Sequence, residues 1–171
     1  MQTRRSVLFI GRFQPFHKGH EKILSHLLKR YFRVTLAIGS AQKRRTKDNP
    51  FSARERKEMI MRVVRMHKGW TSRIRFAYLA DHRSNAVWVR ILRARFSPSH
   101  FVIAAANPLV RRLCKKTGYT LDPSPLFKRA EWEGKTIRAK ARAGRPIRSL
   151  LSSALRVWMQ EKGKKIIRES G

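Results

Sequence analysis

Two histidines three residues apart, His17 and His20, are the side chains of this chain best suited by type and spacing to do chemistry. They follow the short apolar run 7–10, and Gly19 lies between them. A helix that starts here offers free backbone N–H groups and a positive dipole end, both of which favour phosphate. Imidazoles add hydrogen-bond donors without a large fixed charge. The two histidines taken alone favour a simple helix cap, and it is the ten-residue string 11–20 around them that favours a phosphate-binding turn.

The hydrophobic pattern predicts the scaffold that positions these residues. Buried strands are expected over residues 7–10, 34–38, 74–79 and 100–105, with a short fifth strand over 119–121. Helices are expected over residues 19–30, 52–69, 85–96, 107–118, 135–143 and 149–160. This alternation predicts an α/β fold with a doubly wound, mostly parallel sheet, helices on both faces and a helical C-terminal part. Ligands of such sheets bind at the carboxyl ends of the strands.

Local signals define several of these helices. Ser52 and Glu55 have the spacing of a capping box, and Asn107 before a proline is typical of a helix start. In the helix over 85–96, we expect four side chains to point inward: Val87, Trp88, Ile91 and Leu92.

Length and composition limit the domain organisation. The 171 residues, 42% of them apolar, suit a single domain over 1–171. Within it we expect an α/β core over about 1–122, a helical subregion over about 123–160 and a basic tail over 161–171 that frays at its end. No apolar run approaches the roughly 20 residues of a membrane span, and no secretion signal is recognisable, so we expect a cytoplasmic protein without a membrane partner. The single cysteine, Cys114, excludes an internal disulfide framework and a cysteine-based zinc site.

The charge of the chain is unusual. Lysine and arginine number 41 against 10 aspartate and glutamate residues, a formal net charge of +31. Such an excess attracts polyanions, so nonspecific nucleic-acid binding is expected at low salt. The charge is open to two interpretations: a solvated surface suited to a salt-rich or arginine-biased organism, or contact with nucleic acid or anionic substrates.

Longer strings around these residues resemble a known family. The string GRFQPFHKGH at residues 11–20 resembles the archaeal-type nicotinamide-nucleotide (NMN) adenylyltransferases of the HxGH nucleotidyltransferase superfamily. Four further strings at predicted strand ends and helix starts support the resemblance: IGSAQK at 38–43, NPFSARER at 49–56, NAVWV at 85–89 and NPLVRRL at 107–113. The resemblance covers about residues 7–151, and it implies the Rossmann-like form of the doubly wound fold.

The reaction is implied by this resemblance alone. In the family, the 5′-phosphate of nicotinamide mononucleotide attacks the α-phosphorus of ATP, and NAD and pyrophosphate are formed. Mg²⁺ held chiefly by phosphates and water is implied as the cofactor, with no metal ligand from the protein, although other divalent ions also suit such a site. ATP and nicotinamide mononucleotide are the implied partners, and a homo-oligomer is the implied assembly.

The resemblance also assigns roles residue by residue. The implied catalytic residues are His17, His20, Arg12 and Arg138. The implied ATP and phosphate contacts are Gly11, Arg12, Phe13, His17, Gly19, His20, Gly134, Lys135, Thr136 and Arg138. The implied contacts of the nicotinamide nucleotide are Phe13, Ser40, Asn85, Trp88 and Asn107. An indole can stack on a cationic pyridinium ring, although a tryptophan at helical spacing also suits plain core packing.

Some positions depart from the family pattern. In its second phosphate loop, Glu133 and Lys135 replace a serine and a threonine, and Ala105 and Ala106 replace a serine and a glycine after the fourth strand. These changes keep two alternatives open. One is a related nucleotidyltransferase with another phosphate-bearing acceptor. The other is a basic nucleic-acid-binding protein that retains the fold.

Overall fold

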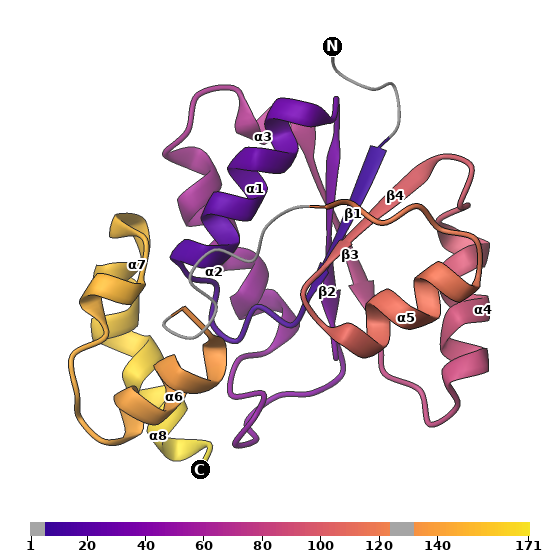
Figure 1. Ribbon diagram of the computed structural model, residues 1–171. Coiled ribbons are helices and arrows are strands. Elements are labelled where there is room, and N and C mark those ends of the chain that lie inside the picture. Colours follow the sequence, from indigo (N-terminus) through magenta and orange to yellow (C-terminus); the bar gives the residue numbers. More distant parts are fainter. Residues whose placement is uncertain (1–5, 124–131) are drawn as a thin grey trace.

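A four-stranded parallel sheet forms the centre of the structure, a computed structural model that describes residues 6–123 and 132–171 (Figure 1). The strands are β1 (Ser6–Gly11), β2 (Val34–Gly39), β3 (Ile74–Leu79) and β4 (Phe101–Ala105). Their order is β3-β2-β1-β4, because the chain runs outward from β1 to β3 and then returns to pair β4 with the free edge of β1. The strand order therefore reverses between β1 and β4, the position where open α/β sheets bind their ligands.

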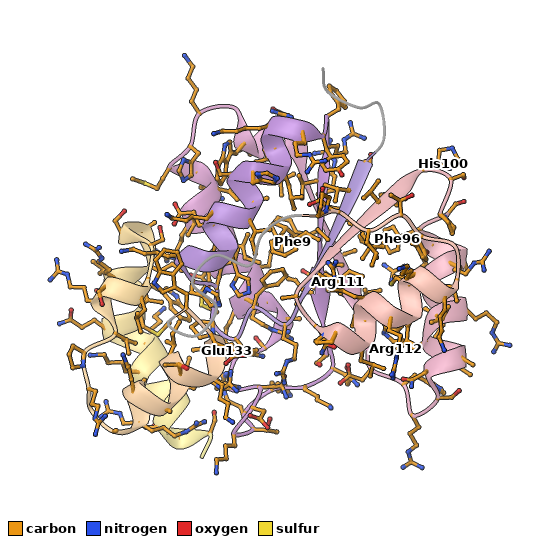
Figure 2. All side chains as sticks on the ribbon, in the orientation of Figure 1. Phe9, Phe96, His100, Arg111, Arg112 and Glu133 are labelled. Carbon is orange, nitrogen blue, oxygen red and sulfur yellow. The ribbon has the colours of Figure 1, made fainter. Side chains whose placement is uncertain are left out.

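Helices cover both faces of this sheet. Alternate residues of β1 point to opposite sides. Val7 and Phe9 pack with α1 (Lys18–Arg30) and α2 (Ala53–Arg65). Leu8 and Ile10 pack with α4 (Asn85–Arg95) and α5 (Pro108–Lys116). Figure 2 shows Phe9 and Phe96 on these two opposite sides. The predicted doubly wound, parallel α/β architecture is confirmed.

The C-terminal part is helical almost to its last residue. It consists of α6 (Gly134–Arg142), the 3₁₀ turn η1 (Arg148–Leu150), α7 (Ser153–Trp158), the π-helical turn η2 (Met159–Gly163) and α8 (Lys164–Glu169). Ile137, Leu155 and Ile167 are fully buried in the same apolar cluster as the α1–α2 face of the sheet. Ile167 therefore anchors the basic segment 161–171 to the core.

Three expectations are corrected by the structure. Ile91 was expected to point inward but is 45% exposed, because Val89, Leu92 and Phe96 form the buried side of α4. The helix expected over 52–69 ends earlier, at Arg65, and a short helix α3 (Trp70–Arg73) precedes β3. Residues 119–121 form no strand and contribute only a bridge between Leu121 and Ile103.

Over residues 6–123 and 132–171, no helix has the length and apolar character needed to cross a bilayer.

Candidate active site

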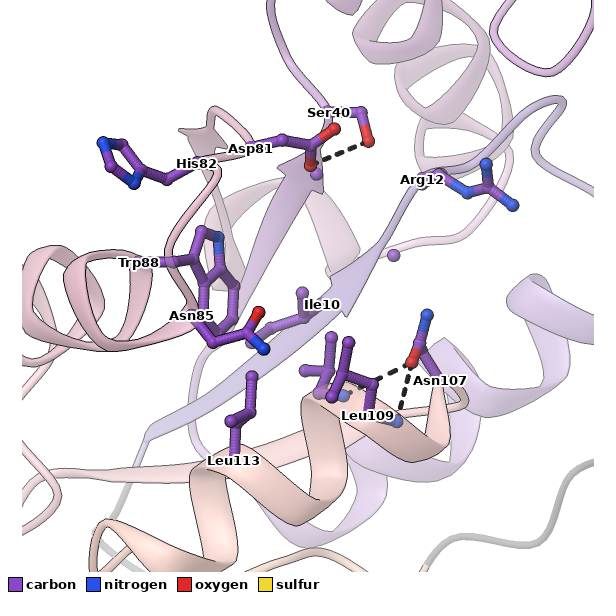
Figure 3. A pocket seen from close by; sticks show the side chains of 13 residues that line it. Ile10, Arg12, Ser40, Asp81, His82, Asn85, Trp88, Asn107, Leu109 and Leu113 are labelled. Carbon is purple, nitrogen blue, oxygen red and sulfur yellow. Dashed lines mark hydrogen bonds between the residues drawn. The ribbon is translucent and has the colours of Figure 1, made fainter.

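Two cavities open at the carboxyl ends of the strands and share one wall. The larger has a volume of about 520 Å³ and lies between the turn after β1 and the start of α6. The smaller has a volume of about 240 Å³ and lies between the end of β1 and the starts of α4 and α5 (Figure 3). Gly11, Arg12 and Asn107 line both cavities. Two ligands bound in the two cavities would therefore meet at the Gly11–Arg12 turn.

The histidine pair lies on the wall of the larger cavity. His17 immediately precedes α1, and His20 lies in its first turn. The two imidazole rings stack with centroids 3.7 Å apart. The backbone N–H of His17 donates to Nδ1 of His20 at 3.3 Å, so a neutral His20 carries its proton on Nε2. Nδ1 of His17 is buried and has no hydrogen-bond partner in the structure.

Both histidines are neutral near physiological pH. Burial lowers the pKa of His17 to about 3. Burial, reinforced by the neighbouring His17 ring, lowers the pKa of His20 well below its ordinary value. Three phenylalanines pack around the His20 ring, namely Phe9, Phe13 and Phe16. This apolar support explains the lowered pKa values, because a charged imidazole would lose its hydration there.

Gly19 lies close against the His17 ring. A Cβ atom on Gly19 would lie 3.1 Å from the His17 ring. Gly19 therefore leaves room for the ring beside the first turn of α1.

Arg138 connects the C-terminal helix α6 to the turn after β1. Its guanidinium is almost fully buried, and Nη1 donates to the carbonyl oxygen of Gln14 at 2.8 Å. Nη2 donates to Oδ1 of Asp48 at 3.0 Å. A Cβ on Gly134 would approach the Gln14 carbonyl oxygen to 2.8 Å, so glycine permits the start of α6 to lie against this turn. Arg138 lines the larger cavity despite these two fixed contacts.

Two carboxylates, Asp48 and Glu133, and one further cation, Lys135, also line the larger cavity. Asp48 is 70% exposed along its side chain, and Glu133 and Lys135 at the start of α6 are also exposed. All three line the larger cavity, and Figure 2 shows Glu133 next to α6. Thr136, a predicted phosphate contact, is not among the described residues that line it.

A second buried arginine holds the loops of the site together. Arg56 in α2 is completely buried, and its Nη1 donates to the carbonyl oxygens of Arg12 at 2.9 Å and Gly39 at 2.6 Å. Its Nη2 donates to the carbonyl oxygen of Ser40 at 3.1 Å. Burial, and then the charge of Arg12, lowers the pKa of Arg56 to about 10. One guanidinium thus fixes the ends of β1 and β2 relative to each other.

The smaller cavity combines an aromatic wall with a carboxylate. Figure 3 shows Trp88 and Asn85 from α4 facing Leu109 and Leu113 from α5. Asn107 caps α5, and its Oδ1 accepts from the N–H groups of Leu109 and Val110. The cavity therefore presents an indole face beside amide groups.

The carboxylate of this cavity is Asp81. Its Oδ1 accepts from the hydroxyl of Ser40 at 3.0 Å, and its Oδ2 lies 2.8 Å from Nζ of Lys43. Although burial acts to raise it, these two hydrogen bonds hold the pKa of Asp81 below its ordinary value. Ser40 has a positive φ of 48°, an uncommon conformation for a residue other than glycine. The hydrogen bond to Asp81 supports it.

The structure thus separates most of the predicted site residues into the two cavities. The predicted phosphate contacts on the larger cavity are Gly11, Arg12, Phe13, His17, Gly19, His20, Gly134, Lys135 and Arg138. The predicted contacts of the nicotinamide nucleotide on the smaller cavity are Ser40, Asn85, Trp88 and Asn107. Phe13, which was also predicted to contact that nucleotide, has a buried side chain and lines the larger cavity.

Sequence reasoning missed four residues of this site. Gln14 and Arg56 were read only as parts of the matched strings, and Asp48 and Asp81 were not singled out at all. Asp81 lies two residues after the last residue of β3, and this position at a strand end could have identified it. No local signal distinguishes Arg56 from the many other arginines of the chain.

Comparisons with known proteins agree with this arrangement. The cytidylyltransferase-like family model matches residues 8–108. The nicotinamide-nucleotide adenylyltransferase of Thermoplasma acidophilum is 39% identical over 148 residues, which cover 85% of this chain and 81% of that protein. The protein of the same name from Pyrococcus horikoshii is 36% identical over 154 residues, which cover 90% and 82%.

A solved structure shares the fold. It is a bifunctional NMN adenylyltransferase/ADP ribose pyrophosphatase from Francisella tularensis, complexed with AMP and a manganese ion. It superposes with a TM-score of 0.77 at 23% identity over 97% of this chain. The chain spans about half of that protein, 52% of its length.

Proposed function

The chain belongs to the nicotinamide-nucleotide adenylyltransferases of the cytidylyltransferase-like family, and we propose that it transfers AMP from ATP to nicotinamide mononucleotide. The products are NAD and pyrophosphate. The observation that carries this proposal is the pair of cavities that meet at Gly11 and Arg12. One cavity offers cations, imidazoles and two helix starts to a triphosphate, and the other offers an indole to a pyridinium ring.

The proposed reaction is a direct displacement at phosphorus. A phosphate oxygen of nicotinamide mononucleotide forms a bond to the α-phosphorus of ATP. The bond from that phosphorus to its bridging oxygen breaks, and the electron pair leaves with pyrophosphate. The attacking phosphate is already largely deprotonated at neutral pH, because its second pKa lies near 6. The protein therefore needs no general base, and its contribution is positioning and charge stabilisation.

The residues of the larger cavity suit this task. Neutral His17 and His20 would donate hydrogen bonds to phosphate oxygens, supported by the free N–H groups at the start of α1. Lys135 and Arg138 would balance the charge that accumulates on the departing pyrophosphate. Arg12, exposed at the junction of the cavities, would contact the phosphates of both substrates. The stacked rings and the buried guanidinium are preorganised, which limits rearrangement during the reaction.

A divalent cation suits the larger cavity. The family resemblance implies Mg²⁺, and the donors on the wall are the carboxylates of Asp48 and Glu133. The described residues contain no group of three or more histidine, cysteine or acidic side chains that could hold a metal ion. This donor set fits an ion held mainly by phosphate oxygens and water, with one or two carboxylates at most. Bound in this way, the ion would neutralise charge on the triphosphate.

A single assay tests the proposal. Purified protein is incubated with ATP, nicotinamide mononucleotide and MgCl₂, and NAD is separated by chromatography while released pyrophosphate is measured in parallel. Equal amounts of both products are expected. Pyrophosphate without NAD, or neither product, would contradict the proposal.

A second candidate acceptor is favoured by Glu133, Lys135, Ala105 and Ala106, which depart from the family pattern, and three of them, Glu133, Lys135 and Ala106, line the larger cavity. The same pyrophosphate assay is run with other phosphate-bearing acceptors in place of the nicotinamide nucleotide. An acceptor with a higher kcat/KM than nicotinamide mononucleotide would favour this second function.

We also propose a cytoplasmic location and a homo-oligomer, as the family resemblance implies. Immunofluorescence or cell fractionation tests the location. Sedimentation equilibrium at 300 mM salt tests the assembly, because high salt screens the repulsion between such positively charged chains. A species with the mass of one chain, 20.1 kDa, would contradict the oligomer.

A further inference from the structure

The two helices that cover the Leu8 and Ile10 side of the sheet, α4 and α5, carry basic residues but no acidic ones. No aspartate or glutamate occurs between Asp81 and Asp122, a stretch that contains both α4 and α5. These helices pack against each other and lie together in the ribbon (Figure 1). Their basic residues are Arg90, Arg93, Arg95, Arg111, Arg112, Lys115 and Lys116. We call the outer surface of these two helices the α4–α5 face.

Elsewhere in the described chain most of the acids take part in ion pairs. The pairs with lysine or arginine are Arg30–Asp122, Lys43–Asp81, Arg45–Glu55, Arg62–Glu58, Arg138–Asp48 and Lys165–Glu169. None of them involves a cation of α4 or α5. The helices of the α4–α5 face therefore contain no acidic side chain to balance their charge.

The exposed cations of this face that lack a carboxylate partner among the described residues include Arg90, Arg93, Arg112 and Lys116. By contrast, Arg95 donates to the carbonyl oxygen of Tyr78 and Arg111 to that of Ala105. Arg90 and Arg93 are three residues apart, and Arg112 and Lys116 are four apart. Each pair therefore lies on one side of its helix, where like charges repel. A bound polyanion would remove this repulsion.

We propose that the α4–α5 face binds the phosphodiester backbone of a nucleic acid. Arginine predominates on it, and its planar guanidinium matches phosphate oxygens in a two-pronged geometry. Displacement of counterions from the nucleic acid would drive the association. The exposed apolar side chains here, Ile91 and Leu109, are 45% and 41% exposed. A lipid surface is less well matched, because membrane-bound helices bury a continuous apolar side.

This surface is separate from the proposed reaction. None of the four cations lines either cavity. Nucleic-acid binding and NAD synthesis can therefore fail independently, and each is measured by its own assay.

The test compares two variants with the same change of charge. The face variant carries Arg90→Gln, Arg93→Gln, Arg112→Gln and Lys116→Gln. The control variant carries Arg145→Gln, Arg148→Gln, Arg168→Gln and Lys162→Gln, four exposed positions in the C-terminal part. Both replace three arginines and one lysine. Fluorescence anisotropy measures binding to a labelled 20-base-pair DNA duplex and a single-stranded RNA of the same sequence, between 50 and 300 mM KCl.

The proposal expects binding by the wild-type chain at 150 mM KCl to at least one of the two probes. The face variant is expected to bind at least about 10-fold more weakly, and its slope of log K against log salt on the duplex should be shallower by about 3 to 4. The control variant should retain nearly the wild-type affinity, and both variants should synthesise NAD at the wild-type rate. The preferred probe then identifies RNA or DNA as the partner.

Three results would overturn the proposal. One is the absence of binding to both probes at 150 mM KCl. Another is an equal loss in the two variants, which would assign the binding to the total charge of the chain. The third is displacement of either probe by polyglutamate as effectively as by unlabelled nucleic acid, which would assign the face to an acidic protein.

Discussion

His17 and His20 form a stacked pair of neutral imidazoles, with ring centroids 3.7 Å apart, at the start of α1. The pair makes stability depend on pH. The pKa of His17 is about 3 in the folded chain against 6.5 in a model peptide, and the pKa of His20 is lowered as well. Below pH 6.5 the two imidazoles therefore bind protons in the unfolded chain but stay neutral in the folded chain. The free energy of unfolding decreases as the pH falls.

We accordingly expect the free energy of unfolding to be level above pH 6.5 and to decline between pH 6.5 and 5. Each such histidine contributes about 1.4 kcal/mol per pH unit in this window. Urea unfolding at a series of pH values measures the decline. His17→Asn should reduce it, whereas His100→Asn, an exposed control, should not. A wild-type stability that stays level down to pH 5 would contradict the neutral pair.

The second prediction concerns catalysis by His20. In the proposed reaction His20 donates a hydrogen bond to phosphate, so turnover of His20→Ala should fall by about 10²- to 10³-fold. The fold should be retained, which circular dichroism checks, and His100→Ala should leave turnover unchanged. Turnover of His20→Ala within threefold of wild type would exclude a role for this imidazole in the displacement.

Substitution of Arg138 should mainly weaken the binding of ATP. The variant Arg138→Ala loses a charged phosphate contact, worth about 1.5–3 kcal/mol, which corresponds to a rise of about 10- to 100-fold in the KM for ATP. The KM for nicotinamide mononucleotide should change much less. Asp48→Asn tests the ion pair separately, because it removes the charge that holds Nη2. Unchanged ATP kinetics in Arg138→Ala would mean that the start of α6 does not contact the triphosphate.

Substitution of Trp88 should mainly weaken the binding of nicotinamide mononucleotide. Loss of its indole in Trp88→Ala removes about 0.5–2 kcal/mol of cation–π attraction, so the KM for nicotinamide mononucleotide should rise about 2- to 30-fold. Ile91→Ala, at an exposed position of the same helix, is the matched control. A larger effect of Trp88→Ala on ATP than on nicotinamide mononucleotide would assign the adenine to this cavity.

Arg56 should affect both substrates because it fixes both loops. Arg56→Lys keeps the charge but cannot reproduce the fork of hydrogen bonds to Arg12, Gly39 and Ser40. We expect a loss of about 1–3 kcal/mol in stability for each carbonyl left unpaired, together with a lower kcat and higher KM values for both substrates. Arg54→Lys, an exposed neighbour, is the control. A variant with lower stability and wild-type kinetics would reduce Arg56 to a purely structural residue.

The strands and the histidine turn could be predicted because their signals are local. Buried parallel strands appear as continuous apolar runs, and the string at residues 11–20 identifies the turn that follows the first of them. The side chains that hold the turn in place could not be predicted, because their partners are distant in the chain. Arg138 reaches back to Gln14 across 124 positions, and Arg56 reaches Arg12 across 44.

The buried side of α4 could not be predicted from the sequence for a different reason. The apolar periodicity of this helix includes Val87, Val89, Ile91 and Leu92, so it is compatible with more than one buried side. Tertiary packing against the sheet selects Val89 and Leu92 and exposes Ile91. Similarly, the basic composition of residues 161–171 suggests a solvated end, and only the burial of Ile167 reveals the helix.

The wall shared by the two cavities makes the enzyme susceptible to bisubstrate inhibitors. A compound that tethers an adenosine phosphate to a nicotinamide-like ring could span the Gly11–Arg12 turn with a short linker. Once one half is bound, the tether raises the effective concentration of the other half, so the whole compound can bind far more tightly than either fragment. Contacts to Glu133 and Lys135 would make such a compound selective for this chain, because these two residues differ from the serine and threonine of the family's phosphate loop.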